Sequence, residues 1–148
     1  MPTFHLPPDL RAELVVYARE ALPDEACGFL LGTEDFHVTA VRSARNLSPH
    51  SEDRFTITPE DYAKAERHCA RHAGTRILGF WHSHPRSPAQ PSRVDLEEAQ
   101  GLMRSFPDRY LYLIVSLARD EAELACWRLD EQGGQFEKLE LRSTHEHA

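Results

Sequence analysis

The sequence predicts one α/β domain in which a central mixed β-sheet is flanked by about three helices. Three observations indicate this fold class. Apolar residues recur at helical spacing over residues 8–22 and two further segments have helix-starting residues, short apolar or alternating runs lie between these segments, and the two kinds of segment follow one another in mixed order. The chain has 148 residues, which suits a single domain. We assign that domain to residues 1–142 and expect a disordered tail at residues 143–148.

The ends of the helical segments are marked by specific residues. Pro23 ends the first segment. Thr58 can cap the second, and Gly74 is a natural stop after it. Ser92 can cap the third, and Asp95 follows three residues later, close to a capping-box arrangement. The expected helices therefore cover residues 8–22, 59–73 and 92–105.

Seven further runs are typical of β-strands. The runs at residues 26–31 and 110–117 are mostly apolar, as expected for buried strands. Residues 132–135, Gln-Gly-Gly-Gln, form a hairpin turn. The remaining strands are expected at residues 36–45, 54–58, 76–82, 123–129 and 136–141.

Composition argues against several classes of function. The formal net charge is −7, and we expect no nucleic-acid partner because binding a phosphate backbone needs clustered Lys and Arg. No apolar run is long enough for a membrane span, and the N-terminus has no signal-peptide pattern. Three widely spaced cysteines, Cys27, Cys69 and Cys126, favour reduced, packed thiols in a cytoplasmic protein over a disulfide framework.

Two histidines and an aspartate have the pattern of an open metal site. His82 and His84 end an apolar run, and side chains two residues apart on a strand point to the same face. Asp95 lies in the first turn of the following helix, beyond a connection stiffened by three prolines. Two imidazoles and a carboxylate suit zinc and leave a fourth position for water. The pattern therefore predicts a zinc hydrolase.

The role of Ser92 is open on spacing alone. Its hydroxyl could stabilise an oxyanion that forms on a carbonyl carbon beside the metal. It could also act only as the helix cap, which needs the same oxygen to accept a backbone N–H. The two roles are compatible if the hydroxyl proton points outward.

A zinc hydrolase also needs a base for the proton of the bound water, and the histidine motif supplies none. Glu25 is distinctive because it stands just before the apolar run at residues 26–31, at the mouth of a strand. Spacing alone leaves four other acidic residues as alternatives, namely Asp24, Glu52, Glu97 and Glu98.

Other metal templates fit poorly. His68 and His72 are four residues apart on a helix, but Cys69 stands where the HExxH motif needs glutamate. A zinc nucleotide deaminase would need HxE and PCxxC, and the chain has neither. His145 and His147 could bind metal only adventitiously.

The segment from His82-Ser83-His84-Pro85 to Ser92-Arg93-Val94-Asp95 resembles the JAMM (MPN+) metalloprotease signature, HxHPx6SxxD. Residues 22–32 resemble the N-terminal PxExxG block of that family. Residues 45–48 and 55–61 resemble the middle block of its short bacterial members. The resemblance runs from about residue 8 to residue 130.

This resemblance implies a zinc-dependent peptidase or isopeptidase with a cytidine-deaminase-like fold. His82, His84 and Asp95 would be the zinc ligands. Ser92 would help to stabilise the tetrahedral intermediate. Glu25 would deprotonate the metal-bound water and then protonate the leaving amine.

The resemblance also implies a class of substrate. The chain looks most like bacterial relatives that cut after the C-terminal Gly-Gly of small ubiquitin-like or sulfur-carrier proteins. A glycine tail can approach a metal closely and could add to a sheet edge as a strand. Family members often pair, so a homodimer is expected. Two alternatives stay open, a non-catalytic scaffold like the metal-free members of the superfamily, and a zinc hydrolase of a small amide.

Overall fold

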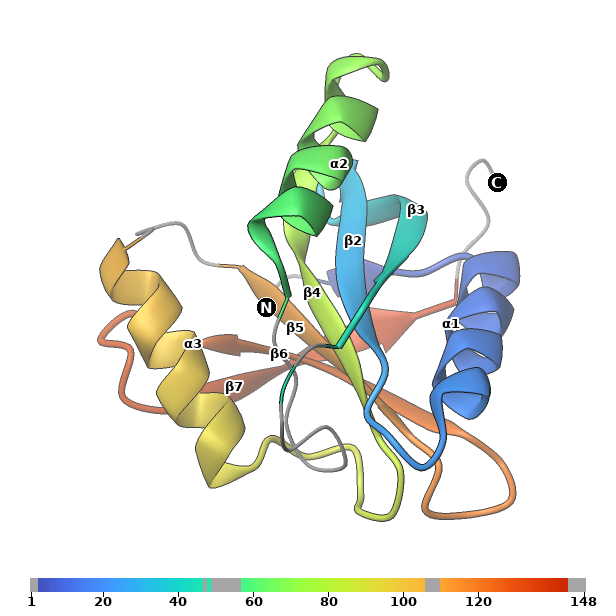
Figure 1. Ribbon diagram of the computed structural model, residues 1–148. Helices are drawn as coiled ribbons and strands as arrows, with labels where there is room; N and C mark the ends of the chain where they lie inside the picture. Colours follow the sequence, from blue (N-terminus) through green and yellow to red (C-terminus); the bar gives the residue numbers. More distant parts are fainter. Residues whose placement is uncertain (1–2, 47, 49–56, 106–109, 144–148) are drawn as a thin grey trace.

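The computed structural model describes residues 3–46, 48, 57–105 and 110–143. Within these residues seven strands form one closed mixed barrel, in the order β1-β3-β2-β4-β5-β6-β7 (Figure 1). Three helices pack against it. The elements are β1 (Thr3–His5), α1 (Pro8–Ala21), β2 (Cys27–Thr33), β3 (His37–Ala44), α2 (Pro59–Ala70), β4 (Arg76–His84), α3 (Arg93–Ser105), β5 (Leu111–Ser116), β6 (Glu123–Leu129) and β7 (Phe136–Arg142).

Strand β4 is the centre of the arrangement. It pairs antiparallel with β2 and parallel with β5, and α3 provides the crossover between β4 and β5. In register, His82 lies opposite Cys27 on β2 and Ile114 on β5. The C-terminal ends of β4 and β5 therefore meet the N-terminal end of β2, which is where polar side chains can gather beside a buried sheet.

The two faces of β4 belong to different apolar clusters. Trp81 is fully buried in the cluster that also takes Leu14 and Ala18 of α1. Phe80 packs with Phe29 and with residues of α2 and α3 in the second cluster. Figure 1 shows α1 on one side of the barrel, with α2 and α3 on other sides. Because side chains alternate along a strand, His82 and His84 share the face of Phe80.

Most expected elements are found within a few residues of their expected bounds. Thr58 caps α2, where its Oγ1 accepts the Asp61 N–H at 3.1 Å. The expected strand at residues 54–58 is wrong in its described part, because Ile57 and Thr58 lie outside any strand. Residues 54–56, and the expected tail apart from Ser143, lie outside the described residues.

Strand β1 is the element that the sequence did not predict. It has only three residues, too few to show a period, and its pairing is entirely long-range. Phe4 pairs with Leu141 of β7, and His5 pairs with both Arg142 and His37 of β3. This short strand closes the expected central sheet into a barrel.

None of the helices in the described parts of the chain combines the length and apolarity needed to cross a bilayer.

Candidate metal centre

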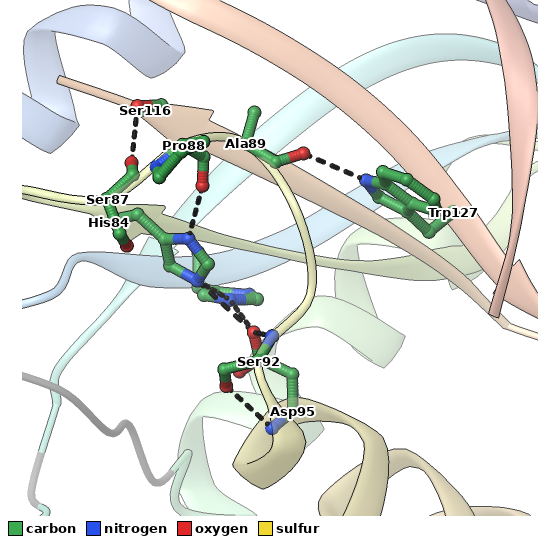
Figure 2. Close-up of polar contacts among 9 residues, drawn as sticks. His84, Ser87, Pro88, Ala89, Ser92, Asp95, Ser116 and Trp127 are labelled. Carbon is green, nitrogen blue, oxygen red and sulfur yellow. Dashed lines mark hydrogen bonds and ion pairs between the residues drawn. The ribbon is translucent and has the colours of Figure 1, made fainter. Parts of the chain in front are cut away.

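Strand β4 and helix α3 bring the three sequence-predicted ligands together. His82 and His84 are 2% and 4% exposed, and their Nε2 atoms lie 3.2 Å apart. One carboxylate oxygen of Asp95, Oδ2, lies 3.2 Å from each of these nitrogens (Figure 2). Among the residues that the structure describes, this is the only group of three or more His, Cys, Asp or Glu side chains whose ligand atoms come within 4.8 Å of one another.

A reciprocal cap at the start of α3 fixes the Asp95 carboxylate. The Ser92 N–H donates to Asp95 Oδ2 at 2.9 Å, and the Asp95 N–H donates to Ser92 Oγ at 3.0 Å. This is the capping box that the spacing predicts, with aspartate in place of glutamate. The Ser92 oxygen acts only as an acceptor in this cap, so its hydroxyl proton can point outward and the two roles considered for Ser92 are compatible.

Contacts within the cluster shift the pKa values of Asp95 and His84. Burial by itself would raise the pKa of Asp95, but hydrogen bonds from His82 and His84 and from the Ser92 N–H lower it below its ordinary value. Burial lowers the pKa of His84, but hydrogen bonds to Asp95 and to the Pro88 carbonyl raise it more. Asp95 is therefore ionised at neutral pH. An anionic oxygen between two imidazole nitrogens is a donor set that fits a divalent ion such as zinc.

Glu25 is held beside this cluster by two hydrogen bonds between its neighbour Ala26 and Ser83 of β4. It stands just before β2, where the Ala26 N–H donates to Ser83 Oγ at 2.8 Å and the Ser83 N–H donates to the Ala26 carbonyl at 3.0 Å. Glu25 is 5% exposed, and its charge contributes to the raised pKa of His84. The Asn46 side-chain amide donates to the Glu25 carbonyl at 3.0 Å.

The structure separates Glu25 from the other candidate bases. Glu97 and Glu98 are exposed on α3, and Asp24 is intermediate in exposure. Glu52 lies outside the described residues. Of the candidates that are described, Glu25 is the buried carboxylate at this end of β2 and β4.

Sequence reasoning missed the residues that hold Glu25 in place. Ser83 is fully buried, and it points away from the two histidines because neighbouring side chains on a strand alternate. In the sequence, the signal for Ser83 was its position between His82 and His84. Asn46 belongs to the segment that resembles the family's middle block, but nothing in the local sequence links it to Glu25. His68 of α2 stacks on His72, which follows the helix, with ring centroids 4.2 Å apart, and neither is part of the metal cluster.

A groove of about 830 Å³ begins at the metal cluster. His82 and Asp95 line it together with side chains from α2, α3 and β5. Its wall is rich in aromatic rings, and the hydroxyls of Tyr62 and Tyr110 lie 3.2 Å apart. The remaining lining residues include Phe80, Tyr112, Leu102, Glu66 and Glu98. A concave, mostly apolar site with a few polar groups is typical of a ligand-binding site.

Comparison with known families agrees with this geometry. Residues 7–130 match the family model described as prokaryotic homologs of the JAB domain. The chain belongs to this family. It has the JAB/MPN fold, and the expected α/β class and JAMM resemblance are confirmed.

Three similar proteins carry the comparison further. A desampylase from Haloferax volcanii is 34% identical over 113 residues, which are 73% of this chain and 76% of the relative. A desampylase from Pyrococcus furiosus is 35% identical over 123 residues, or 83% of this chain and 78% of the relative. A protein from Desulfitobacterium hafniense with a solution structure superposes with a TM-score of 0.76 at 32% identity, covering 99% of this chain and 97% of that one. With the family match, the desampylases confirm the expected enzyme class, a JAMM-type hydrolase.

Proposed function

We propose that this protein is a zinc-dependent peptidase or isopeptidase that hydrolyses the amide bond after the C-terminal Gly-Gly of a small ubiquitin-like or sulfur-carrier protein. The observation that carries the proposal is the meeting of His82, His84 and Asp95 at 3.2 Å beside the buried Glu25. The two relatives named desampylases support a protein modifier as the substrate.

The chain supplies the metal ligands and the proton carrier of the reaction. His82 and His84 would hold zinc through Nε2, and Asp95 would hold it through Oδ2. Zinc bound in such a site polarises the scissile carbonyl and makes a water acidic enough to attack near neutral pH. The Glu25 carboxylate takes the proton of the attacking water as the carbon–oxygen bond forms. It then returns this proton to the amine nitrogen as the carbon–nitrogen bond breaks.

Ser92 stabilises the charge that develops on the substrate. Its Oγ is already oriented by the Asp95 N–H, at 3.0 Å. The hydroxyl proton is then available to the carbonyl oxygen as that oxygen becomes negative. A donor fixed in this way needs no reorganisation during the reaction, which is the condition for strong electrostatic stabilisation.

The groove beside the cluster is the binding site that we assign to the carrier tail. An extended tail cannot add as a strand to the two strands that carry the cluster. Each already has neighbours on both sides, β3 and β4 for β2, and β2 and β5 for β4. The expected addition of the tail to a sheet edge named no strand, and β2 and β4 offer no such edge. The groove reaches His82 and Asp95 directly, and glycine at the end of the tail lets the backbone approach them.

Glu25→Gln tests this mechanism. The amide keeps the size of the side chain but cannot carry the proton, so cleavage of a carrier protein extended past its Gly-Gly should fall by about 10²- to 10⁴-fold. Intact-mass spectrometry before and after incubation measures the cleavage. Zinc binding should persist, because Glu25 is not one of the three ligands.

Glu97→Gln is the matched control. It makes the same chemical change at an exposed position on α3, and cleavage should stay at the wild-type rate. A chelator should abolish activity, and added zinc should restore it. Full activity of Glu25→Gln, or activity that survives the chelator, would show the proposal to be wrong. Cleavage of small amides but of no carrier adduct would favour the small-amide hydrolase, and undamaged protein without metal would favour the scaffold.

A further inference from the structure

The loop between β4 and α3 presents three successive carbonyls, and each accepts a hydrogen bond from a different side chain (Figure 2). The middle one accepts from the candidate ligand His84. The other two accept from strands that follow α3 in the sequence. The contacts are Ser116 Oγ to the Ser87 carbonyl at 2.6 Å, His84 Nδ1 to the Pro88 carbonyl at 2.8 Å, and Trp127 Nε1 to the Ala89 carbonyl at 3.1 Å.

The composition of the loop explains why it needs these contacts. Pro85, Pro88 and Pro91 have no backbone N–H, so the loop has few donors of its own. Of the three residues whose carbonyls accept, Ala89 is buried and its carbonyl needs a protein donor, whereas Ser87 and Pro88 are exposed. The neighbouring strands β5 and β6 provide the donors for Ser87 and Ala89.

Ser116 is fixed in position and in orientation. It is 2% exposed and pairs in register with His84 across the parallel β4–β5 ladder. The Leu117 N–H donates to the His84 carbonyl at 3.0 Å, which locks the two strand ends together. Ser116 Oγ also accepts the Ala118 N–H at 3.2 Å, so its single hydroxyl proton is directed to the Ser87 carbonyl.

Trp127 holds the other side of the loop. Its ring packs against a small apolar cluster formed by Ala89, Ile114 and Ala125. Ala89 is 2% exposed, so the carbonyl that accepts the indole N–H belongs to a buried residue. Trp127 thus contributes both apolar contact and a directed donor to the same residue of the loop.

We infer that Ser116 and Trp127 are positioning residues for the metal ligand His84, and that they act through the Pro88 carbonyl. Holding the carbonyls on either side fixes the acceptor for His84 Nδ1–H. With the proton on Nδ1, Nε2 presents its lone pair towards His82 and Asp95. The inference rests on the proposed role of His84 as a metal ligand.

Metal affinity is the measurement that tests this inference. The variants are Ser116→Ala, which removes the hydroxyl, and Trp127→Phe, which keeps a ring but removes the N–H. Zinc affinity of the full chain, measured by competition with a chromogenic chelator, should fall by about 10- to 100-fold in each. Ser116→Thr keeps the hydroxyl and should retain most of the affinity. Ser143→Ala, at an exposed serine, and Lys138→Met, which keeps the length of the side chain but removes the ammonium over the Trp127 ring, are the controls.

Two readouts distinguish positioning from a purely structural role. The absorption spectrum of the cobalt-substituted protein should change in Ser116→Ala and Trp127→Phe but not in the controls. Nitrogen NMR of the zinc-loaded wild type should show the His84 proton on Nδ1, a result that needs no variant to fold. Wild-type zinc affinity and cobalt spectra in both variants would overturn the inference while leaving the proposed function intact. A proton on Nε2 would overturn the inference and also the assignment of Nε2 as the atom through which His84 holds zinc. If zinc affinity falls in both variants but the wild type cleaves no carrier adduct, the inference is supported and the proposed function is contradicted. A wild type that binds no zinc would overturn both.

Discussion

At the scale of single residues, one oxygen of Asp95 has two structural roles. Oδ2 accepts the Ser92 N–H at 2.9 Å and lies 3.2 Å from the Nε2 atoms of both histidines. The start of α3 and the metal cluster therefore share an atom. The sequence predicted His82, His84, Asp95 and Ser92 because their spacing is local, and it singled out Glu25 only by its place before an apolar run.

Zinc binding should depend on pH through His84. Its pKa is raised above the ordinary 6.5, so in metal-free protein zinc must displace a proton from His84 up to a higher pH than from a free imidazole. Zinc affinity should therefore rise with pH through this raised pKa, with release of protons. The proton on His84 stabilises the metal-free fold at low pH, and this contribution is lost as pH rises through the raised pKa. Titration calorimetry in two buffers of different ionisation enthalpy measures the release, and equal heats in both would contradict it.

The cysteines should react as packed thiols. Burial raises the pKa of Cys27 to about 12 from an ordinary 9.0, with smaller effects from the Asp61 and Glu25 carboxylates. Burial also raises the pKa of Cys126 and of the half-buried Cys69. At about pH 8 the thiols are neutral and unreactive. Iodoacetamide labelling read by mass spectrometry should modify Cys69 first in folded protein and all three in urea. Rapid labelling of Cys27 in the folded state would show this prediction to be wrong.

At the scale of elements, the capping box at the start of α3 uses the same two residues, Ser92 and Asp95, that the metal site needs. Thr58 caps α2 through its hydroxyl oxygen, which the sequence also predicted because a cap depends only on residues three positions apart. The sequence could not predict β1 or the contacts of Ser116 and Trp127. These depend on which strands become neighbours, and no local pattern records that.

Ser92→Ala should separate the two roles of this residue. Loss of the cap should cost about 1 kcal/mol in the free energy of unfolding, measured by urea denaturation of metal-free protein. Loss of the donor should lower kcat by about 10²- to 10³-fold, more than the lost stability can explain. Ser92→Thr keeps both functions of the hydroxyl and serves as the control. An unchanged kcat with reduced stability would leave Ser92 as a cap alone.

At the scale of the whole molecule, barrel closure joins the two ends of the described chain. The fully buried Phe4 of β1 pairs with Leu141 of β7 and packs in the same cluster as Trp81 of β4. The predicted boundaries of the domain, a homodimer, and a cytoplasmic location stay predictions. So does the absence of a nucleic-acid partner.

Phe4→Ala tests the contribution of β1 to the barrel. Removing a fully buried phenylalanine should cost about 3–5 kcal/mol in the free energy of unfolding. Zinc affinity of the folded fraction should change little, because Phe4 lies in the apolar cluster on the other face of β4. Val16→Ala on α1, where the side chain is 52% exposed, is the control and should cost far less. A loss of less than 1 kcal/mol for Phe4→Ala, on the order of a surface substitution, would mean that β1 is dispensable.

The sequence by itself determined the features that depend on neighbours along the chain. These are the two histidines on one face of a strand, the cap that starts α3, and the alternation that divides core from surface. Only the tertiary structure decided which distant segments meet. Pairing of β2 with β4 brings Glu25 to the histidines, and pairing of β4 with β5 and of β5 with β6 brings Ser116 and Trp127 to the loop. The reason is physical, because strand pairing joins residues through hydrogen bonds and packing that leave no periodic trace in the segments between them.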